Sequence, residues 1–414
     1  MTMLKINDQR LLNDLDSLAQ IGATADGGVS RTALSDEDLA GRAWLRERII
    51  AAGLEYQQDG AGNQSAILRS SEADAKTLLA GSHIDTVPNG GRYDGALGTL
   101  AALEALRTIK DAGLALPYHL EAIAFTDEEG THVGGLFGSQ AMTGALTQEK
   151  LANPRGGRDK LIAGMQRAGL TEESIFSAKR DPTTLAGWLE LHIEQGTRLE
   201  EAGIDIGVVT SIVGIRSFVL HFIGQAGHAG TTPMDKRKDA LWGAAAFVQQ
   251  ARDVIIKQFP PGVVNCGVIE AQPGAFNIIP GVVELALEFR HGDDAQLDAM
   301  QKMLLDTAQS VAREHGLRLE SEARGGVLPA PMDATVISAI ESAAERLGLS
   351  HTRLMSFAGH DTQAVSKITP GGMLFVPSVD GISHNPNEFT KPEDCVNGAN
   401  VVLQALLILA GVEA

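Results

Sequence analysis

Cysteine is scarce in this chain of 414 residues, which holds only Cys266 and Cys395, far apart and in no paired ligand spacing. This scarcity argues against a disulfide framework and a Cys-based metal site, and indicates two buried thiols in a reducing compartment. No run approaches the ~20 apolar residues of a membrane helix. Residues 1–20 lack the basic start and unbroken apolar core of a secretion signal. We therefore expect a cytoplasmic protein.

Basic residues are also few, because the chain has 34 Lys and Arg against 52 Asp and Glu, which gives a formal net charge of −18. A surface of that sign disfavours nucleic acid and anionic membranes as partners and leaves a small molecule as the expected ligand. The length exceeds what one hydrophobic core usually supports, so we expect two domains.

Strand-like and helical segments alternate in the first part of the chain, which predicts an α/β layer architecture. Ser35 precedes acidic residues and an amphipathic stretch, the pattern of a capped helix. The expected elements are a helix over 39–52, a strand over 77–81, a helix over 95–112 and a strand over 118–125.

The pattern changes near Val213, where a β-α-β-β-α-β order begins and predicts a small α+β domain inserted into the first. We place the return at residues 325–331, a stretch that contains Gly325-Gly326, Pro329 and Pro331. The expected elements are strands 216–223, 263–269, 282–290 and 317–323 with helices 239–258 and 294–315, then helix 333–347 and strand 372–376. The expected domain ranges are 1–212 and 329–414 for the larger domain and 213–328 for the inserted one.

Two segments place metal-ligand side chains at the end of the strand over 77–81. Gly81-Ser-His-Ile-Asp-Thr-Val87 sets His83 and Asp85 two positions apart, so we expect both on one strand face, where Asp85 can accept the second ring proton of His83. Asp94 lies in the glycine-rich loop Gly90-Gly-Arg-Tyr-Asp-Gly95 directly before a helix. Its two oxygens can reach two ions.

Three adjacent acids follow the strand that ends at Phe125, in Thr126-Asp-Glu-Glu-Gly130. Like charges repel, so a solvated loop is one interpretation. The alternative uses Glu129 as a metal ligand and Glu128 as a free carboxylate. Glu128 would take a proton from the attacking water and pass it to the leaving nitrogen.

Two further histidines are His192, in Leu191-His-Ile-Glu-Gln-Gly196, and His384, in Gly381-Ile-Ser-His-Asn-Pro386. Either histidine alone is more often structural. Together with His83, Asp94 and Glu129, however, they form a set of imidazoles and carboxylates that suits Zn, Mn, Co or Ni. The sequence therefore predicts two divalent ions per subunit that share a ligand and activate water.

These segments and Gly227-His-Ala-Gly-Thr-Thr-Pro-Met234 resemble those of the aminoacylase/carboxypeptidase-type dinuclear metallopeptidase superfamily, from about residue 30 to the C-terminus. Gln195 and Thr231-Thr-Pro-Met234 resemble more narrowly its hydantoinase/carbamoylase branch. That branch contains N-carbamoyl-L-amino acid hydrolases, β-ureidopropionases and allantoate amidohydrolases. The resemblance implies a catalytic α/β domain, with a central mixed sheet and helices on both faces, and an inserted α+β lid domain through which subunits form a homodimer.

The resemblance also implies roles for single residues. Glu128 would be the general base, and His228, from the lid, would polarise the scissile carbonyl oxygen. Arg290 would bind the substrate carboxylate through its guanidinium fork. The implied metal ligands are His83 and His384 as terminal ligands of opposite ions, Asp94 as the bridge, and Glu129 and His192 to complete the shells. The other implied substrate-binding residues are Gln195, Arg216, Asn277, Gly359 and His360.

The leading hypothesis is an enzyme that hydrolyses an N-carbamoyl-L-amino acid to the amino acid, CO2 and NH3. Allantoate amidohydrolase and β-ureidopropionase stay open as alternatives, and allantoate also offers a ureido group and a carboxylate. A metallo-aminopeptidase or dipeptidase is more distant. A binding module without activity is disfavoured, because Glu128 is intact.

Overall fold

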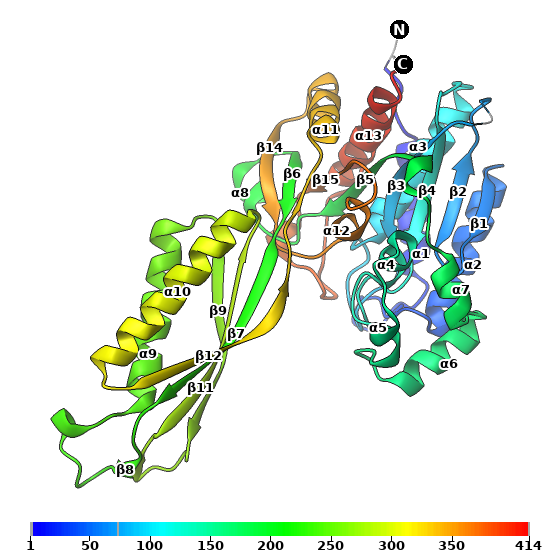
Figure 1. Ribbon diagram of the computed structural model, residues 1–414. Coiled ribbons are helices and arrows are strands. Elements are labelled where there is room, and N and C mark those ends of the chain that lie inside the picture. Colours follow the sequence, from blue (N-terminus) through cyan, green and yellow to red (C-terminus); the bar gives the residue numbers. More distant parts are fainter. Residues whose placement is uncertain (1–2, 73, 413–414) are drawn as a thin grey trace. The chain divides into compact units, whose positions relative to one another are not determined.

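The computed structural model describes residues 3–72 and 74–412, and the chain divides into two compact units (Figure 1). The first unit runs to Thr210, resumes over Met332–Leu354 and continues from Ala358. The second unit consists of Ser211–Pro331 and the short segment Met355–Phe357. The second unit is thus an insertion into the first.

A mixed sheet forms the centre of the first unit. Its strands are β1 (Glu55–Gln58), β2 (Gln64–Leu68), β3 (Thr77–His83), β4 (His119–Phe125), β5 (Leu185–Ile193), β6 (Ile206–Ile212), β14 (His351–Ser356) and β15 (Gly371–Val376). They follow the order β1-β2-β4-β3-β5-β15-β6, and β14 also pairs with β6. The inner strands β4, β3, β5 and β15 are parallel, whereas β1, β2 and β6 pair antiparallel to their neighbours.

Helices cover both faces of this sheet (Figure 1). The helices of this unit are α1 (Asp8–Ala19), α2 (Asp36–Ala51), α3 (Ala96–Asp111), α4 (Phe137–Thr143), α5 (Gln148–Ala152), α6 (Arg158–Ala168), α7 (Glu172–Ser177), α8 (Arg198–Ala202), α11 (Ala334–Leu347), α12 (Thr362–Val365) and α13 (Pro392–Leu409). α3 packs on β3, β4 and β5, and α13 packs on β5 and β15. Met142 of α4 and Val365 of α12 join Leu79 and Trp188 of the sheet in a separate apolar cluster. The predicted α/β domain is confirmed.

The second unit is an antiparallel sheet covered by two helices. Its strands are β7 (Gly214–Ile223), β9 (Val263–Gln272), β11 (Val282–His291) and β12 (Arg318–Val327), in the order β12-β7-β11-β9, and its helices are α9 (Ala240–Gln258) and α10 (Asp294–Glu314). Alternate residues of β11, such as Leu285 and Phe289, are buried in the apolar core, whereas Glu288 and Arg290 lie on the other face. The predicted β-α-β-β-α-β order is confirmed. Two short strands, β8 (Gly227–His228) and β10 (Ile278–Ile279), pair with each other in this unit, whereas β13 (Ala330–Pro331) pairs with β6 at the edge of the mixed sheet.

Gly325-Gly326, at the start of the stretch 325–331 where the sequence places the return to the larger domain, lies inside β12, which is longer than the strand expected over 317–323. Gly325 has a φ of +98° and follows a register shift after Ala323, so the glycines accommodate a β-bulge. Cys266 is only half-buried, while Cys395 is buried as expected.

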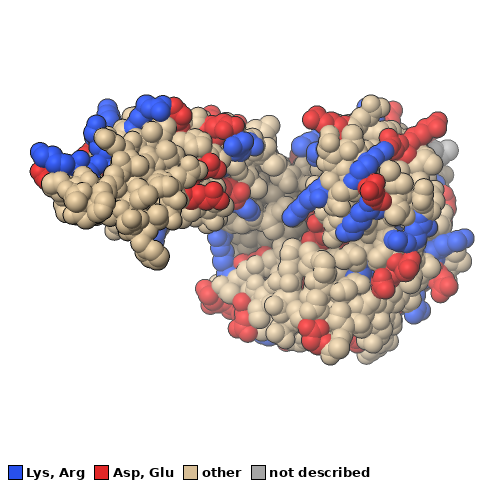
Figure 2. Space-filling model, turned by 90° about the horizontal axis from the view of Figure 1, so that it is seen from below, with Lys and Arg blue, Asp and Glu red and all other residues tan. Residues whose placement is uncertain are grey.

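The surface carries both signs of charge. Acidic and basic side chains are interspersed over the face that Figure 2 shows. None of the described helices is long and apolar enough to cross a membrane.

Candidate metal centre and active site

The carboxyl ends of three neighbouring parallel strands carry most of the expected site. His83 is the last residue of β3, and His192 is the next to last residue of β5. Glu128 and Glu129 follow the end of β4. Since parallel strands end at one edge of a sheet, these side chains are brought together there. Loops before α3 and α13 add Asp94 and His384.

Asp94 is shared by two groups of metal-ligand side chains, and within each group the ligand atoms all lie within 4.8 Å of one another. His83 and His192 complete the first group, and Glu129 and His384 complete the second. Oδ1 of Asp94 lies 3.5 and 3.0 Å from Nε2 of His83 and His192, and Oδ2 lies 3.3 Å from Nε2 of His384. Ligands at zinc-type distances around a tetrahedral ion are about 3.4 Å apart, so this spacing fits two ions that share Asp94.

Backbone contacts fix the protonation of two imidazoles. Nδ1 of His83 lies 3.0 Å from the carbonyl oxygen of Asp85, and Nδ1 of His192 lies 2.9 Å from that of Ile193. A carbonyl only accepts, so each Nδ1 carries a proton and Nε2 is the ring atom that faces Asp94. Burial opposes ionisation of both rings, but the charge of Glu128 raises the pKa of His83 and that of Asp94 raises the pKa of His192. Positive charge is thus favoured between each Nε2 and Asp94, where a divalent ion would take the place of the Nε2 proton. The donor set therefore fits a cation.

The Asp85 carboxylate differs from the expectation. Its Oδ1 lies 3.7 Å from Nδ1 of His83, farther than the backbone carbonyl of the same residue. Its two oxygens instead accept the backbone N–H groups of Glu128 and Glu129, each at 3.3 Å. β3 ends at His83, so the same-face argument does not extend to Asp85. Asp85 holds the loop that carries the expected base.

Four buried or nearly buried carboxylates converge on this centre, from Asp85, Asp94, Glu128 and Glu129. Burial raises the pKa of Glu128 well above its usual range, although His83 opposes the shift. Burial and the charge of Asp94 raise the pKa of Glu129 to about 7. Burial also disfavours ionised Asp94, but the surrounding imidazoles hold its pKa well below the usual range. So much buried negative charge calls for positive partners, which two divalent ions would supply.

Two residues that the sequence analysis missed hold Asp94 in place. Oγ of Ser383 lies 3.0 Å from Oδ2 of Asp94 and 3.0 Å from Oε2 of Glu388. Oε1 of Glu388 accepts the backbone N–H groups of Tyr93 and Asp94 at 2.9 and 3.1 Å. Both residues flank His384 in the sequence, so a search for polar neighbours of that ligand would have found them.

The expected substrate-binding residues of the first unit lie beside the metal ligands. Nε2 of Gln195 donates to Oδ2 of Asp94 at 2.7 Å, and its Oε1 has no hydrogen-bond partner among the described residues. The free oxygen could accept a substrate N–H. His360 is buried against His192, with ring centroids 4.4 Å apart, and burial lowers its pKa well below the usual range. Gly359, next to it, is exposed.

His228 and Asn277 lie side by side in the second unit. β8 pairs with β10, and the backbone N–H of Ala229 donates to the carbonyl of Asn277 at 3.0 Å. Nδ1 of His228 accepts the backbone N–H groups of Gly230 and Thr231 at 3.0 and 3.2 Å. These bonds leave the ring proton on Nε2, as a donor to a carbonyl oxygen requires.

The two expected arginines lie on opposite faces of the second unit's sheet. Arg290 is on the face without helices, where its guanidinium donates to Glu288 and to the carbonyl of Phe357. Arg216 is on the helix-covered face and forms ion pairs with Asp294 and Asp298, at 3.0 and 2.6 Å. The structure does not bring the two guanidinium groups together.

Comparison with known proteins identifies the family. Residues 79–408 match Peptidase family M20/M25/M40. The chain belongs to this family. An N-carbamoyl-L-amino acid amidohydrolase from Geobacillus stearothermophilus is 36% identical, over 98% of this chain and 99% of that relative. An allantoate amidohydrolase from Bacillus subtilis (strain 168) is 34% identical, over 96% of each.

Comparison with a crystal structure identifies the branch of the M20 family to which the chain belongs. An amidase of the hydantoinase/carbamoylase family from Burkholderia multivorans superposes with a TM-score of 0.90 at 37% identity, and the match covers 99% of this chain and 100% of that one. The chain is therefore an M20 member of the hydantoinase/carbamoylase amidase branch, and the resemblance seen in its motifs is confirmed.

Gly95 offers a test of the metal centre in this M20 amidase. Its φ is +63°, and a Cβ there would lie 2.3 Å from the His83 ring. We expect Gly95→Ala to displace His83 and lower metal affinity by at least about tenfold, measured by metal analysis after dialysis. Gly113→Ala is the matched control, because Gly113 has a φ of +66° and nothing within 4 Å of a Cβ. Equal loss of metal in both variants would contradict the assignment.

Proposed function

We propose that this chain is a metal-dependent amidohydrolase that cleaves the ureido C–N bond of an N-carbamoyl-L-amino acid and releases the amino acid, CO2 and NH3. The observation that carries the proposal is the pair of ligand groups that share Asp94. Glu128 lies beside them and belongs to neither group, with its Oε2 at 3.6 Å from Nε2 of His83. The substrate class rests on the relative whose name states that activity.

Each proposed step is assigned to an atom of a residue that belongs to neither ligand group. Two divalent ions, of Zn, Mn, Co or Ni, would supply Lewis acidity and lower the pKa of a water molecule. Oε2 of Glu128 would take the proton of that water and deliver it to the leaving nitrogen. Oε1 of Gln195 would accept a ureido N–H, and Nε2–H of His228 would donate to the carbonyl oxygen as negative charge develops there.

Allantoate is the second candidate substrate, because a relative of nearly equal identity is named an allantoate amidohydrolase. Both substrates join a ureido group to a carboxylate, so the metal centre accepts either. An assay of N-carbamoyl-L-amino acids, allantoate, β-ureidopropionate and dipeptides with each metal separates these activities. Turnover of dipeptides alone would refute the proposal.

Subunit pairing through the second unit remains part of the proposal. Val268 and Ile269 of β9 are each 48% exposed, which leaves apolar surface for a partner subunit. Light scattering of Ile269→Lys against the unmodified protein tests it, and an unchanged mass would argue against this interface.

Arg290→Lys is expected to raise KM for carboxylate substrates by at least about tenfold with unchanged metal content, because a point ammonium cannot replace the bidentate guanidinium. Steady-state kinetics on one accepted substrate measure the effect. Arg216→Lys is the control, since Arg216 lies on the helix-covered face of the same sheet, paired with Asp294 and Asp298 near α10, whereas Arg290 lies on the other face. A normal KM in Arg290→Lys would mean that the substrate carboxylate binds elsewhere.

A further inference from the structure

Arg290 has an acidic partner, Glu288, on the face of the second unit's sheet that carries no helix. Oε1 of Glu288 accepts from Nε and from Nη2 of Arg290, at 2.9 and 2.7 Å. The carbonyl oxygen of Phe357 accepts from Nη1 at 3.0 Å. A guanidinium has five N–H groups, so these three contacts leave two that the described residues do not use, one on Nη1 and one on Nη2. Two N–H groups are enough for one carboxylate and no more.

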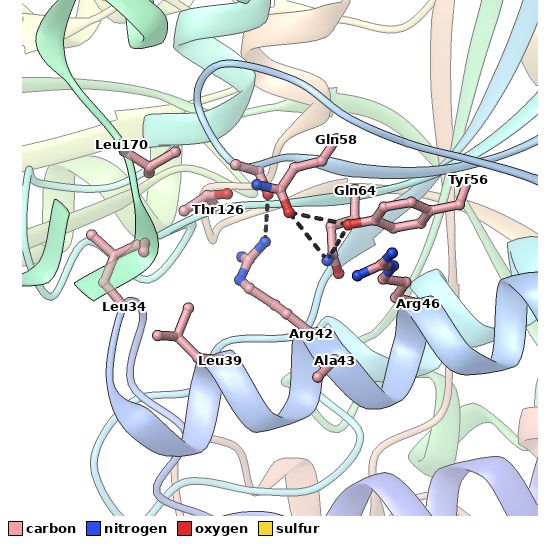
Figure 3. A pocket seen from close by; sticks show the side chains of 12 residues that line it. Leu34, Leu39, Arg42, Ala43, Arg46, Tyr56, Gln58, Gln64, Thr126 and Leu170 are labelled. Carbon is pink, nitrogen blue, oxygen red and sulfur yellow. Dashed lines mark hydrogen bonds between the residues drawn. The ribbon is translucent and has the colours of Figure 1, made fainter. Parts of the chain in front are cut away.

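Arg42 is a useful comparison, because its guanidinium is bonded in a similar way. It donates to the carboxylate of Asp38 and to two backbone carbonyls. Arg42 lines a pocket between α2, β1 and β2, but only 6% of its side chain is exposed (Figure 3). The side chains of Arg290 and Glu288, in contrast, are 34% and 35% exposed. A ligand can therefore reach the Arg290–Glu288 pair, whereas Arg42 is a structural residue.

The residues across from the Arg290–Glu288 pair are uncharged, as the strand register shows. Arg290 and Glu288 lie on the same side of β11 and pair with residues of β7 and β9. Arg290 is flanked by two apolar side chains and Glu288 by two neutral polar ones, namely Ile215 and Val263, and Ser217 and Asn265. Among the described residues of these three strands, Glu288 is thus the only charged neighbour of Arg290 on this face.

The Arg290–Glu288 pair is neutral as a whole, which limits the negative charge that it accepts. One substrate carboxylate uses the two remaining N–H groups of Arg290. A second carboxylate, on the substrate side chain, would find no charged donor in Ile215 or Val263, and the charge of Glu288 would repel it over several Å. A neutral side chain avoids this repulsion and can pack against the apolar neighbours.

We propose that Glu288 is a specificity-determining residue, which makes the enzyme prefer ureido substrates with one carboxylate and an uncharged side chain. Its carboxylate orients the guanidinium of Arg290, and its charge disfavours a second acid on the substrate. This inference rests on the proposed function, in which Arg290 binds the substrate carboxylate. It adds the class of the substrate side chain, which the metal centre does not determine.

Two substrates of nearly equal shape test the preference, N-carbamoyl-L-asparagine and N-carbamoyl-L-aspartate. The metal-loaded enzyme should have a kcat/KM at least about tenfold higher for the asparagine compound. Glu288→Gln keeps an oxygen that accepts from Arg290 but removes the charge, so it should lower this ratio about fivefold, mainly through KM of the aspartate compound. Glu288→Asp keeps the charge and should keep the preference. Metal analysis and circular dichroism check that each variant retains its metal centre and fold.

Glu284→Gln is the matched control, because Glu284 lies on the same face of β11, four residues before Glu288, and is near His221 instead of Arg290. It should leave the ratio unchanged. Equal kcat/KM for the two compounds in the unmodified enzyme, or the same ratio in Glu288→Gln, would overturn the role of Glu288. Hydrolysis of the asparagine compound would then still support the proposed function. If no N-carbamoyl-L-amino acid is hydrolysed, the proposed function fails and this inference fails with it.

Discussion

Glu128→Gln is expected to lower kcat by at least ~10², the lower range for general acid–base catalysis, while two ions stay bound. The change is nearly isosteric and removes only the proton acceptor. Glu128 belongs to neither ligand group, so its loss leaves both groups intact. Steady-state kinetics together with metal analysis on the same preparation measure the effect.

The matched control for this variant is Glu173→Gln, an exposed glutamate of α7. It should leave both kcat and metal content unchanged. A Glu128→Gln enzyme that keeps near-normal kcat with a fully loaded centre would exclude Glu128 as the base.

Asp94→Asn should have an effect at least as large, because Asp94 is the ligand common to both groups. The amide keeps the shape but loses the charge, so we expect loss of both ions and of activity. In the unmodified protein a strong chelator should abolish activity, and Zn, Mn, Co or Ni should restore it. The chelated Asp94→Asn variant should not recover. Metal analysis and activity before and after readdition measure this.

Ser383→Ala is the control for Asp94→Asn, because it removes a hydrogen bond to Asp94 and keeps every ligand. Metal affinity should fall by about 10–100-fold, the usual effect of losing a residue that hydrogen-bonds to a metal ligand. Excess metal should restore activity. Full activity of the unmodified protein after chelation would refute the proposal that its activity depends on metal.

The secondary structure was predictable where periodicity is strong. The alternation along β11 and the capped start of α2 at Ser35 are both present as expected. The convergence of His83 and His192 was predictable too, since each follows a buried strand. The helices α4 to α7 were not assigned, because their runs of at most 11 residues carry little periodic signal.

Contacts between distant segments account for the errors and omissions. The role expected for Asp85 assumed that the strand continues past His83, and the chain turns there instead. The bond from Glu388 to the backbone of Tyr93 joins residues 295 positions apart, which no local pattern reveals. The ion pairs of Arg216 depend on where α10 packs, which is also tertiary information.

The link between Glu388 and Tyr93 has a consequence for synthesis of the chain. A growing chain that ends before β15 already contains the ligands His83, Asp94, Glu129 and His192. It lacks His384 and also Glu388, whose carboxylate accepts the two backbone hydrogen bonds from the loop before α3. Neither the second ligand group nor the final position of Asp94 exists at that stage. Uptake of both ions would thus be coupled to completion of the first unit, and the second ion would stabilise only a chain whose last strand and loop are in place.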